Sequence, residues 1–290
     1  MKVTPLARAF GLRVEGVDVR NLSDSERGEI IRAGNAAGVV HIPEQSLSEA
    51  EQLEFTRLYG RVRVLRVNRA RNSQRPPGIV EISNVDADGN IVPPGNDMIR
   101  FSKGNMMWHS DYSYTADWAA QSILHALEAA SEGGETEWAS TEAAYDAPPE
   151  AEKARLSRLT ATHDRFHSRI KNGFTDFTEE DYKPTPPVPH PLVTTHPVTG
   201  RKALLLGSHV SAIEGMNEAE TEALVAELTA HCCQPEFVYS HVWTPGDIIV
   251  WDNRSTLHRG RPADPTERRV MRRTAVFGEG VEGPEVQVAS

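Results

Sequence analysis

The stretch Trp108-His109-Ser110-Asp111 places two side chains that bind metals two residues apart. In a β-strand, residues i and i+2 point to the same face, so the imidazole of His109 and the carboxylate of Asp111 can hold one metal ion together. A single His-x-Asp arises by chance in a chain of this length. It therefore predicts a metal site in a β-rich fold only if other segments support it.

A second segment, Trp251 to Gly260, supports this site because it carries His258 after a run typical of a strand. A long separation between His109 and His258 is typical of β-sandwiches, in which distant strands meet. Two histidines and one carboxylate form the facial arrangement of non-haem Fe(II) oxygenases, which leaves three metal positions open.

Four arginines follow in Arg268-Arg269-Val270-Met271-Arg272-Arg273. If this segment is a strand, Arg269, Met271 and Arg273 share one face. Arginine forms bidentate pairs with carboxylates, so this face can bind two anionic groups near the metal.

Around these segments the sequence predicts many short strands and a few helices. The predicted strands cover residues 12–15, 17–19, 38–43, 79–83, 119–130, 237–242, 247–251 and 269–277, with a hairpin at 192–206. The predicted helices cover residues 24–37, 49–59, 141–159 with a break at 148–149, and 217–231. Residues 86–107 and the proline-rich residues 172–191 lack a period and are predicted loops. This pattern favours a mainly β jelly roll with peripheral helices (α+β) and no internal repeat.

Composition excludes several classes of protein. The 290 residues include 41 acidic and 31 basic side chains, a net charge of −10 that argues against nucleic-acid binding. The two cysteines, Cys232 and Cys233, are adjacent and form no disulfide framework. No apolar run is long enough to span a membrane, and residues 1–8 do not resemble a signal peptide. We expect a soluble, cytoplasmic protein.

Together these elements resemble the taurine/2,4-dichlorophenoxyacetate dioxygenase (TauD/TfdA) family, which is dependent on Fe(II) and 2-oxoglutarate. The matching pattern is His109-x-Asp111, Thr136 after Gly133-Gly134, His258, Arg269 eleven residues later and Arg273 four residues beyond that. The similarity extends from about Gly16 to Phe277 and is greatest to the phenoxyalkanoate branch, in segments such as 82–85, 143–146 and 251–254. It implies one domain over residues 1–290 with a double-stranded β-helix (cupin-like jelly-roll) core and a mobile active-site loop at about 86–107.

The resemblance also implies roles for individual residues. His109, Asp111 and His258 would bind Fe(II), and Arg269 and Thr136 would bind the distal carboxylate of 2-oxoglutarate, with dioxygen as the other cosubstrate. Arg273, Asn105 and Lys103 would bind an anionic substrate. The other histidines singled out (His163, His167, His190, His196 and His241) are predicted non-ligands. We expect a homo-oligomer, either a dimer, a trimer or a tetramer.

The expected reaction is hydroxylation of an aryloxyalkanoic acid beside its ether oxygen, which yields a phenol and an oxoacid while 2-oxoglutarate becomes succinate and CO2. The sequence leaves an alkylsulfonate or an alkyl sulfate ester open as the substrate. A zinc hydrolase is less well supported, because no His-Glu-x-x-His motif is present and Arg269 would have no role. A metal-free ligand-binding jelly roll would leave the intact triad unexplained.

Overall fold

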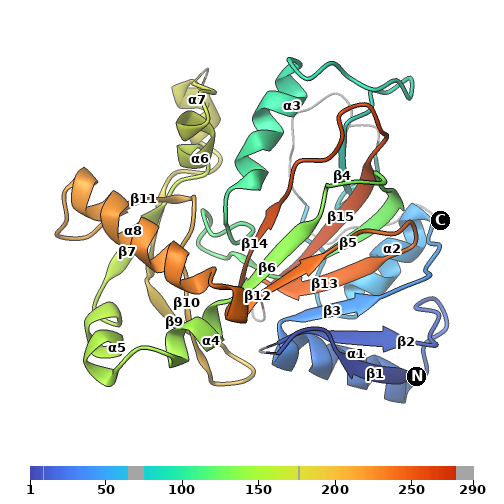
Figure 1. The fold of residues 1–290 in the computed structure, drawn as a ribbon, viewed down its shortest axis with the longest axis horizontal. Helices are drawn as coiled ribbons and strands as arrows, with labels where there is room; N and C mark the ends of the chain where they lie inside the picture. The colour runs from blue at the N-terminus through green and yellow to red at the C-terminus, as the bar shows by residue number, and fades with distance from the viewer. Residues whose placement is uncertain (9, 65–74, 176, 279–290) are drawn as a thin grey trace.

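The computed structural model describes residues 1–8, 10–64, 75–175 and 177–278, and its largest element is a seven-stranded sheet (Figure 1). The strand order is β1-β2-β3-β13-β5-β15-β4, and all pairs are antiparallel except β2 with β3. The strands are β1 (Lys2–Pro5), β2 (Leu12–Glu15), β3 (Val39–Ile42), β13 (Ile248–Asp252), β5 (Ala119–Glu128), β15 (Val270–Phe277) and β4 (Val80–Ser83). From β3 to β4, neighbours in the sheet are distant in sequence, as expected for a jelly roll.

A three-stranded sheet faces the larger one. It contains β12 (Val238–His241), β6 (Thr136–Ser140) and β14 (Thr256–Gly260), in that order. Trp138 from β6 packs in one buried cluster with Trp251 from β13 and Met271 from β15. This cluster joins the two sheets into a sandwich, which agrees with the jelly roll predicted from the sequence.

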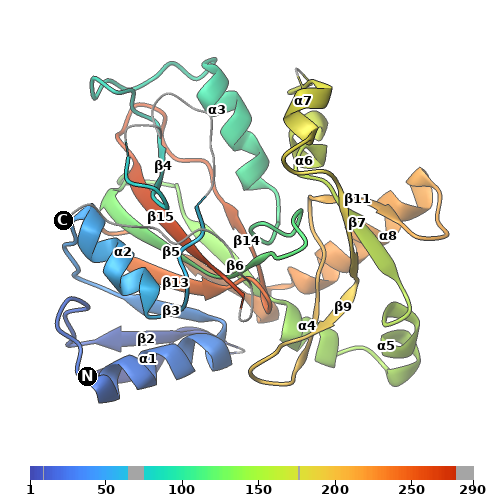
Figure 2. The same cartoon turned by 180° about the vertical axis from the view of Figure 1, so that it is seen from behind.

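Two helices cover the outer face of the large sheet, where Figure 2 shows them beside β2 and β3. They are α1 (Asp24–Ala37) and α2 (Glu49–Arg57), and each begins with the predicted capping box. Ile30 and Phe55 from these helices pack against Val40 and Ile248 of the sheet. Burial of this apolar face holds the helices against the sheet.

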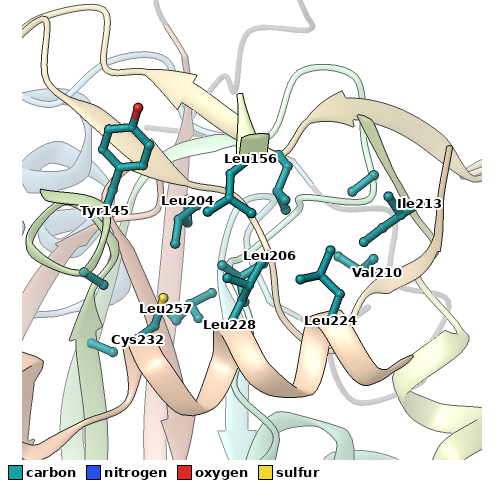
Figure 3. Close-up of a cluster of buried hydrophobic side chains, with 14 of the residues drawn as sticks. Tyr145, Leu156, Leu204, Leu206, Val210, Ile213, Leu224, Leu228, Cys232 and Leu257 are labelled. Atoms are coloured by element: carbon teal, nitrogen blue, oxygen red, sulfur yellow. The ribbon is translucent and has the colours of Figure 1, made fainter. Parts of the chain in front are cut away.

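Most of the segment between β6 and β12 forms a further layer, which surrounds a leucine-rich cluster (Figure 3). In α8 (Glu218–Cys232), Leu224, Leu228 and Cys232 point toward Leu206 and Leu257. The other elements of this layer are α4 (Thr141–Asp146), α5 (Glu150–Leu156), β7 (Thr160–His163), β8 (Val188–Pro191), β9 (Val193–Thr195), β10 (Lys202–Leu204), β11 (Val210–Ile213) and η3 (Pro235–Phe237). Among the described residues, no helix is both long and apolar enough to cross a bilayer.

The structure corrects several local predictions. Residues 17–19 are not a strand, because Asp18 accepts hydrogen bonds from the backbone and side chain of Arg20 and closes a turn. The predicted loop 86–107 contains α3 (Asp97–Ser102) and η2 (Lys103–Met106). The predicted loop 172–191 contains α7 (Glu179–Tyr182) and β8, and α6 (His167–Lys171) precedes it. Helices this short depend on tertiary packing and leave little period in a sequence.

Candidate active site

His109, Asp111 and His258 lie together, although His258 is far from the other two in sequence. The backbone nitrogens of His109 and His258 each donate to the carbonyl oxygen of the other, at 3.0 and 2.8 Å. One ligand atom from each of the three side chains lies within 4.8 Å of the other two, and all three residues are buried. This arrangement can hold one divalent ion and leave part of its coordination sphere open.

The two histidines are poised as metal ligands. His109 Nδ1 lies 2.8 Å from the carbonyl oxygen of Met107, which can only accept, so Nδ1 carries the proton and Nε2 keeps its lone pair. Within the described chain, the His258 side chain makes no hydrogen bond, and its Nδ1 is buried without a partner. Burial lowers the pKa of His109 and lowers that of His258 well below its ordinary value. Both imidazoles are therefore neutral at neutral pH, the form that binds a metal.

The carboxylate of Asp111 is held by a buried network. The Ser122 hydroxyl donates to Asp111 Oδ2 at 2.8 Å, and the Asn253 side-chain amide donates to that hydroxyl at 3.0 Å. The amide oxygen of Asn253 accepts from the backbone nitrogen of Asp111 at 3.1 Å and from Trp251 Nε1 at 3.0 Å. Hydrogen bonds of this kind fix the orientation of a ligand before the metal binds.

The backbone at this point differs from the predicted strand. His109 forms only an isolated bridge with His258, and Asp111 lies in a turn. The next residue, Tyr112, has a φ of 60°, a region that costs energy for any residue with a Cβ. The centroid of its buried ring lies 4.5 Å from the guanidinium carbon of Arg63 and 5.6 Å from the guanidinium carbon of Arg273. Side-chain packing therefore stabilises the turn that aims Asp111.

A cavity of about 220 Å³ lies beside the triad, and His109 and His258 form part of its wall. Nine further lining residues have apolar side chains: Ile82, Val92, Pro94, Ile99, Met106, Leu124, Trp251, Ala263 and Pro265. Residues 92–106, which include α3, supply one side. Arg269, which directly precedes β15, and Arg273 within β15 both line this cavity.

Arg269 has no acidic partner among the described residues. Its one side-chain hydrogen bond there runs from Nη2 to the carbonyl oxygen of Gly134, at 3.3 Å. Gly134 has a φ of 71°, and a Cβ at this position would lie 3.1 Å from Arg269 Nε, so glycine allows the close approach. Burial lowers the pKa of Arg269 to about 10, which still leaves it charged at neutral pH. A cation in this position is suited to bind an anionic ligand.

Thr136, at the start of β6, lines the same cavity. Its hydroxyl oxygen accepts a hydrogen bond from Trp243 Nε1 at 2.9 Å. No acceptor in the described part of the chain takes the hydroxyl proton, so Thr136 can donate it to a ligand. The cavity wall thus combines two histidines of the triad, the cations Arg269 and Arg273, and a free hydroxyl donor.

Comparison with known proteins agrees with this geometry. The family model described as taurine catabolism dioxygenase TauD, TfdA family, matches residues 2–275. The chain belongs to this family. It is an alpha-ketoglutarate (2-oxoglutarate)-dependent dioxygenase with an Fe(II)-type site, and two histidines and one carboxylate fit that metal.

Two relatives match this dioxygenase along nearly their whole lengths. It is 38% identical to the alpha-ketoglutarate-dependent 2,4-dichlorophenoxyacetate dioxygenase of Cupriavidus pinatubonensis, over 96% of this chain and 98% of the relative. It is 36% identical to the (S)-phenoxypropionate/alpha-ketoglutarate-dioxygenase of Sphingobium herbicidovorans, over 96% and 95%. The crystal structure of AAD-2 in complex with Mn(II) and N-oxalylglycine superposes with a TM-score of 0.90 at 35% identity, covering 96% of this chain and 97% of that one. The family and the jelly-roll fold predicted from the sequence are confirmed.

The remaining predicted substrate residues differ in their placement. Asn105 lines the cavity of the dioxygenase, and its side-chain oxygen accepts from Arg169 Nη2 at 2.7 Å. Lys103 is exposed and is not among the residues that line the cavity. Arg169, which no motif singled out, also stacks on Phe101 with its guanidinium carbon 4.7 Å from the ring centroid. Arg169 thus connects α6 to the segment that covers the cavity.

Sequence reasoning also missed the residues that support the ligands. Ser122 lies within β5 and Trp243 follows β12, and neither belongs to a motif. Asn253 lies in the quoted segment 251–260, but nothing in its spacing indicated a contact with Asp111. Only a pairing between β5, β13 and the turn at 109–111 could have revealed these contacts.

Proposed function

We propose that this dioxygenase hydroxylates an aryloxyalkanoic acid at the carbon beside its ether oxygen. The observation that carries this proposal is a largely apolar cavity whose wall includes two residues of the triad, His109 and His258, and, besides Arg269, the cation Arg273. An aromatic ring suits the apolar wall, and a carboxylate suits the arginine. The names of the phenoxyacetate and phenoxypropionate dioxygenases similar to this chain support the same substrate class.

In this proposal, His109, Asp111 and His258 hold Fe(II). When bound, the iron supplies the activation of dioxygen that couples decarboxylation of 2-oxoglutarate to substrate hydroxylation. Arg269 pairs with the distal carboxylate of 2-oxoglutarate, and the Thr136 hydroxyl donates to the same group. This assignment is supported by the charge of Arg269, which has no acidic partner in the described chain, and by the free proton of Thr136.

Arg273 binds the carboxylate of the aryloxyalkanoic acid. One of its nitrogens, Nη1, already donates to Asp111 Oδ1 at 2.6 Å, whereas Nε is buried with no hydrogen-bond partner among the residues that the structure describes. The guanidinium group has five N–H donors, so it can contact Asp111 and a substrate anion together. The apolar wall orients the ring and keeps water away from the reacting C–H bond.

Hydroxylation at the carbon beside the ether oxygen leads to cleavage of the ether. One oxygen atom enters the C–H bond beside the ether oxygen, and the other enters succinate as 2-oxoglutarate loses CO2. The resulting hemiacetal transfers its hydroxyl proton to the ether oxygen, the C–O bond breaks, and a phenol and an oxoacid are released. Alkylsulfonates and alkyl sulfate esters would also pair with Arg273, but an alkyl chain would make less contact with the apolar wall than an aromatic ring.

A coupled product assay tests the substrate class. The purified protein is loaded with Fe(II) under anaerobic conditions, then mixed with oxygenated buffer, 2-oxoglutarate and one acid from each class. We expect 2,4-dichlorophenoxyacetate or a 2-phenoxypropionate enantiomer to release about one phenol per succinate. Release of sulfite from an alkylsulfonate, or of sulfate from a hexyl sulfate ester, without phenol from either aryloxy acid would overturn the proposal.

A further inference from the structure

A second buried group has the same composition as the iron triad. His41 on β3, His241 on β12 and Asp247 before β13 place their ligand atoms within 4.8 Å of one another. We call these three residues the Asp247 cluster. His41 Nε2 lies 2.8 Å from Asp247 Oδ1, and His241 Nε2 lies 3.0 Å from Asp247 Oδ2. The proposed function gives this cluster no role.

The hydrogen bonds of the Asp247 cluster leave no ring nitrogen free for a metal. Arg13 can only donate, and its Nη1 lies 3.1 Å from His41 Nδ1, so the proton of His41 is on Nε2 and faces Asp247. His241 Nδ1 is occupied by the Tyr239 hydroxyl at 2.8 Å. Every ring nitrogen of the cluster therefore has a partner, whereas His258 Nδ1 has none among the described residues. The cluster has a structural use.

The Asp247 cluster holds the turn between β12 and β13. Asp247 Oδ2 accepts from His241 Nε2 and also from the backbone nitrogen of Thr244, at 2.8 Å. These two contacts bracket Trp243, whose ring packs edge-to-face on His241 with centroids 4.8 Å apart. The indole also contacts Trp138, with centroids 6.3 Å apart. The position of Trp243 is thus set by its contacts with both rings.

The indole in turn determines where Thr136 directs its proton. An indole nitrogen is only a donor, so the Thr136 oxygen must accept from Trp243 Nε1 and its own proton must point elsewhere. We propose that Trp243, held by the Asp247 cluster, is a positioning residue that directs the Thr136 hydroxyl toward the distal carboxylate of 2-oxoglutarate. This inference rests on the proposed role of Thr136.

Two Trp→Phe variants provide a matched test. Trp243→Phe removes the N–H but keeps an aromatic ring. Trp118→Phe removes a buried N–H that has no partner among the described residues, on a ring that packs against His190 rather than Trp243. We expect Trp243→Phe to raise the KM for the cosubstrate, 2-oxoglutarate, by about three- to tenfold at unchanged kcat. It should raise the Kd of N-oxalylglycine for the Mn(II)-loaded protein by the same factor. Trp118→Phe should change neither constant.

A double variant separates this inference from the proposed function. If Trp243 acts through Thr136, Thr136→Val raises the KM for the cosubstrate, and adding Trp243→Phe raises it no further. Trp243→His, which keeps a ring N–H, should recover part of the loss. A raised KM in Thr136→Val together with a wild-type KM in folded Trp243→Phe would overturn the inference alone. No effect of Thr136→Val would overturn the role of Thr136 and, with it, the inference.

Metal content tests the description of the Asp247 cluster. We expect the wild-type protein to bind one Mn(II) per chain, and we expect His258→Ala, but not His41→Gln, to lose it. A second equivalent of Mn(II) that disappears in His41→Gln would show a metal site and would contradict the structural use of the cluster.

Discussion

Arg273 Nη1 donates to Asp111 Oδ1 at 2.6 Å, so the guanidinium group that lines the cavity also contacts a metal ligand. Burial alone raises the pKa of Asp111, but the charge of Arg273 and the hydrogen bond from Ser122 favour the ionised carboxylate, and its pKa is lowered to about 2. The carboxylate is therefore ionised at every working pH. In the proposed function, this contact couples substrate binding to the metal site.

Removal of Arg273 should uncouple the reaction. In Arg273→Ala we expect weaker binding of the aryloxy acid, with more succinate released than phenol, because the C–H bond is no longer held near the oxidant. Arg273→Lys should restore coupling only in part, since an ammonium group cannot contact two anions in the same geometry. Succinate and phenol are measured in the same reaction. A variant that melts early but keeps a ratio near one would make Arg273 structural.

Arg269 should govern the affinity for 2-oxoglutarate. Truncation of one partner of a buried charge pair costs roughly 2–5 kcal/mol, so Arg269→Ala should raise the KM for this cosubstrate by about thirtyfold or more. The neighbouring Arg268 pairs with Glu128 at the surface, and Arg268→Ala is the matched control. The two KM values are compared at saturating Fe(II). Equal KM values in the two variants would refute the assignment.

Ser122 should contribute to metal affinity without binding the metal. Ser122→Ala removes the donor to Asp111 Oδ2 and leaves an amide proton of Asn253 without its acceptor. Loss of such support costs about ten- to a hundredfold in metal affinity. The Kd of Mn(II) is measured by calorimetry, with Ser211→Ala as control because that hydroxyl donates to the carbonyl of Thr162. An unchanged Kd in Ser122→Ala would contradict this role.

His163 should make the protein less stable in acid. It is fully buried on β7, neither ring nitrogen has a hydrogen-bond partner in the described part of the chain, and burial lowers its pKa to about 3. Below about pH 6.5 the unfolded chain binds a proton at His163 that the folded chain does not, so the free energy of unfolding falls by about 2 kcal/mol between pH 7.5 and 5. In His163→Phe, denaturant titrations should show a difference between these pH values that is smaller by this amount. A difference as large as that of the wild type would contradict the prediction; His231→Gln is the control.

The sequence predicts the long elements of this fold better than its short ones. Capping boxes at Ser23 and Ser48 and the run at 119–128 determine local structure directly, because their signals lie within one element. The helix α3 has no such signal, since a six-residue helix forms only against the rest of the fold.

The same distinction applies to the site. The pairs His109–Asp111 and Arg269–Arg273 follow from spacing, because the members of each pair lie only two or four residues apart. Ser122, Trp243 and Arg169 do not, because their roles come from contacts between segments far apart in the chain. The φ of Tyr112 also depends on tertiary packing, which explains why a turn replaces the strand expected at Asp111.

The visible absorption of the protein under anaerobic conditions is the decisive measurement for the triad and the cosubstrate site. Chelation of Fe(II) by 2-oxoglutarate gives a weak charge-transfer band, which reports that the triad, the metal and the cosubstrate are assembled. We predict this band at one Fe(II) per chain in the wild type, its absence in His258→Ala, and its appearance in Arg269→Ala only at much higher 2-oxoglutarate. A wild-type protein without the band, or a His258→Ala variant that keeps it, would contradict the assignment of these residues.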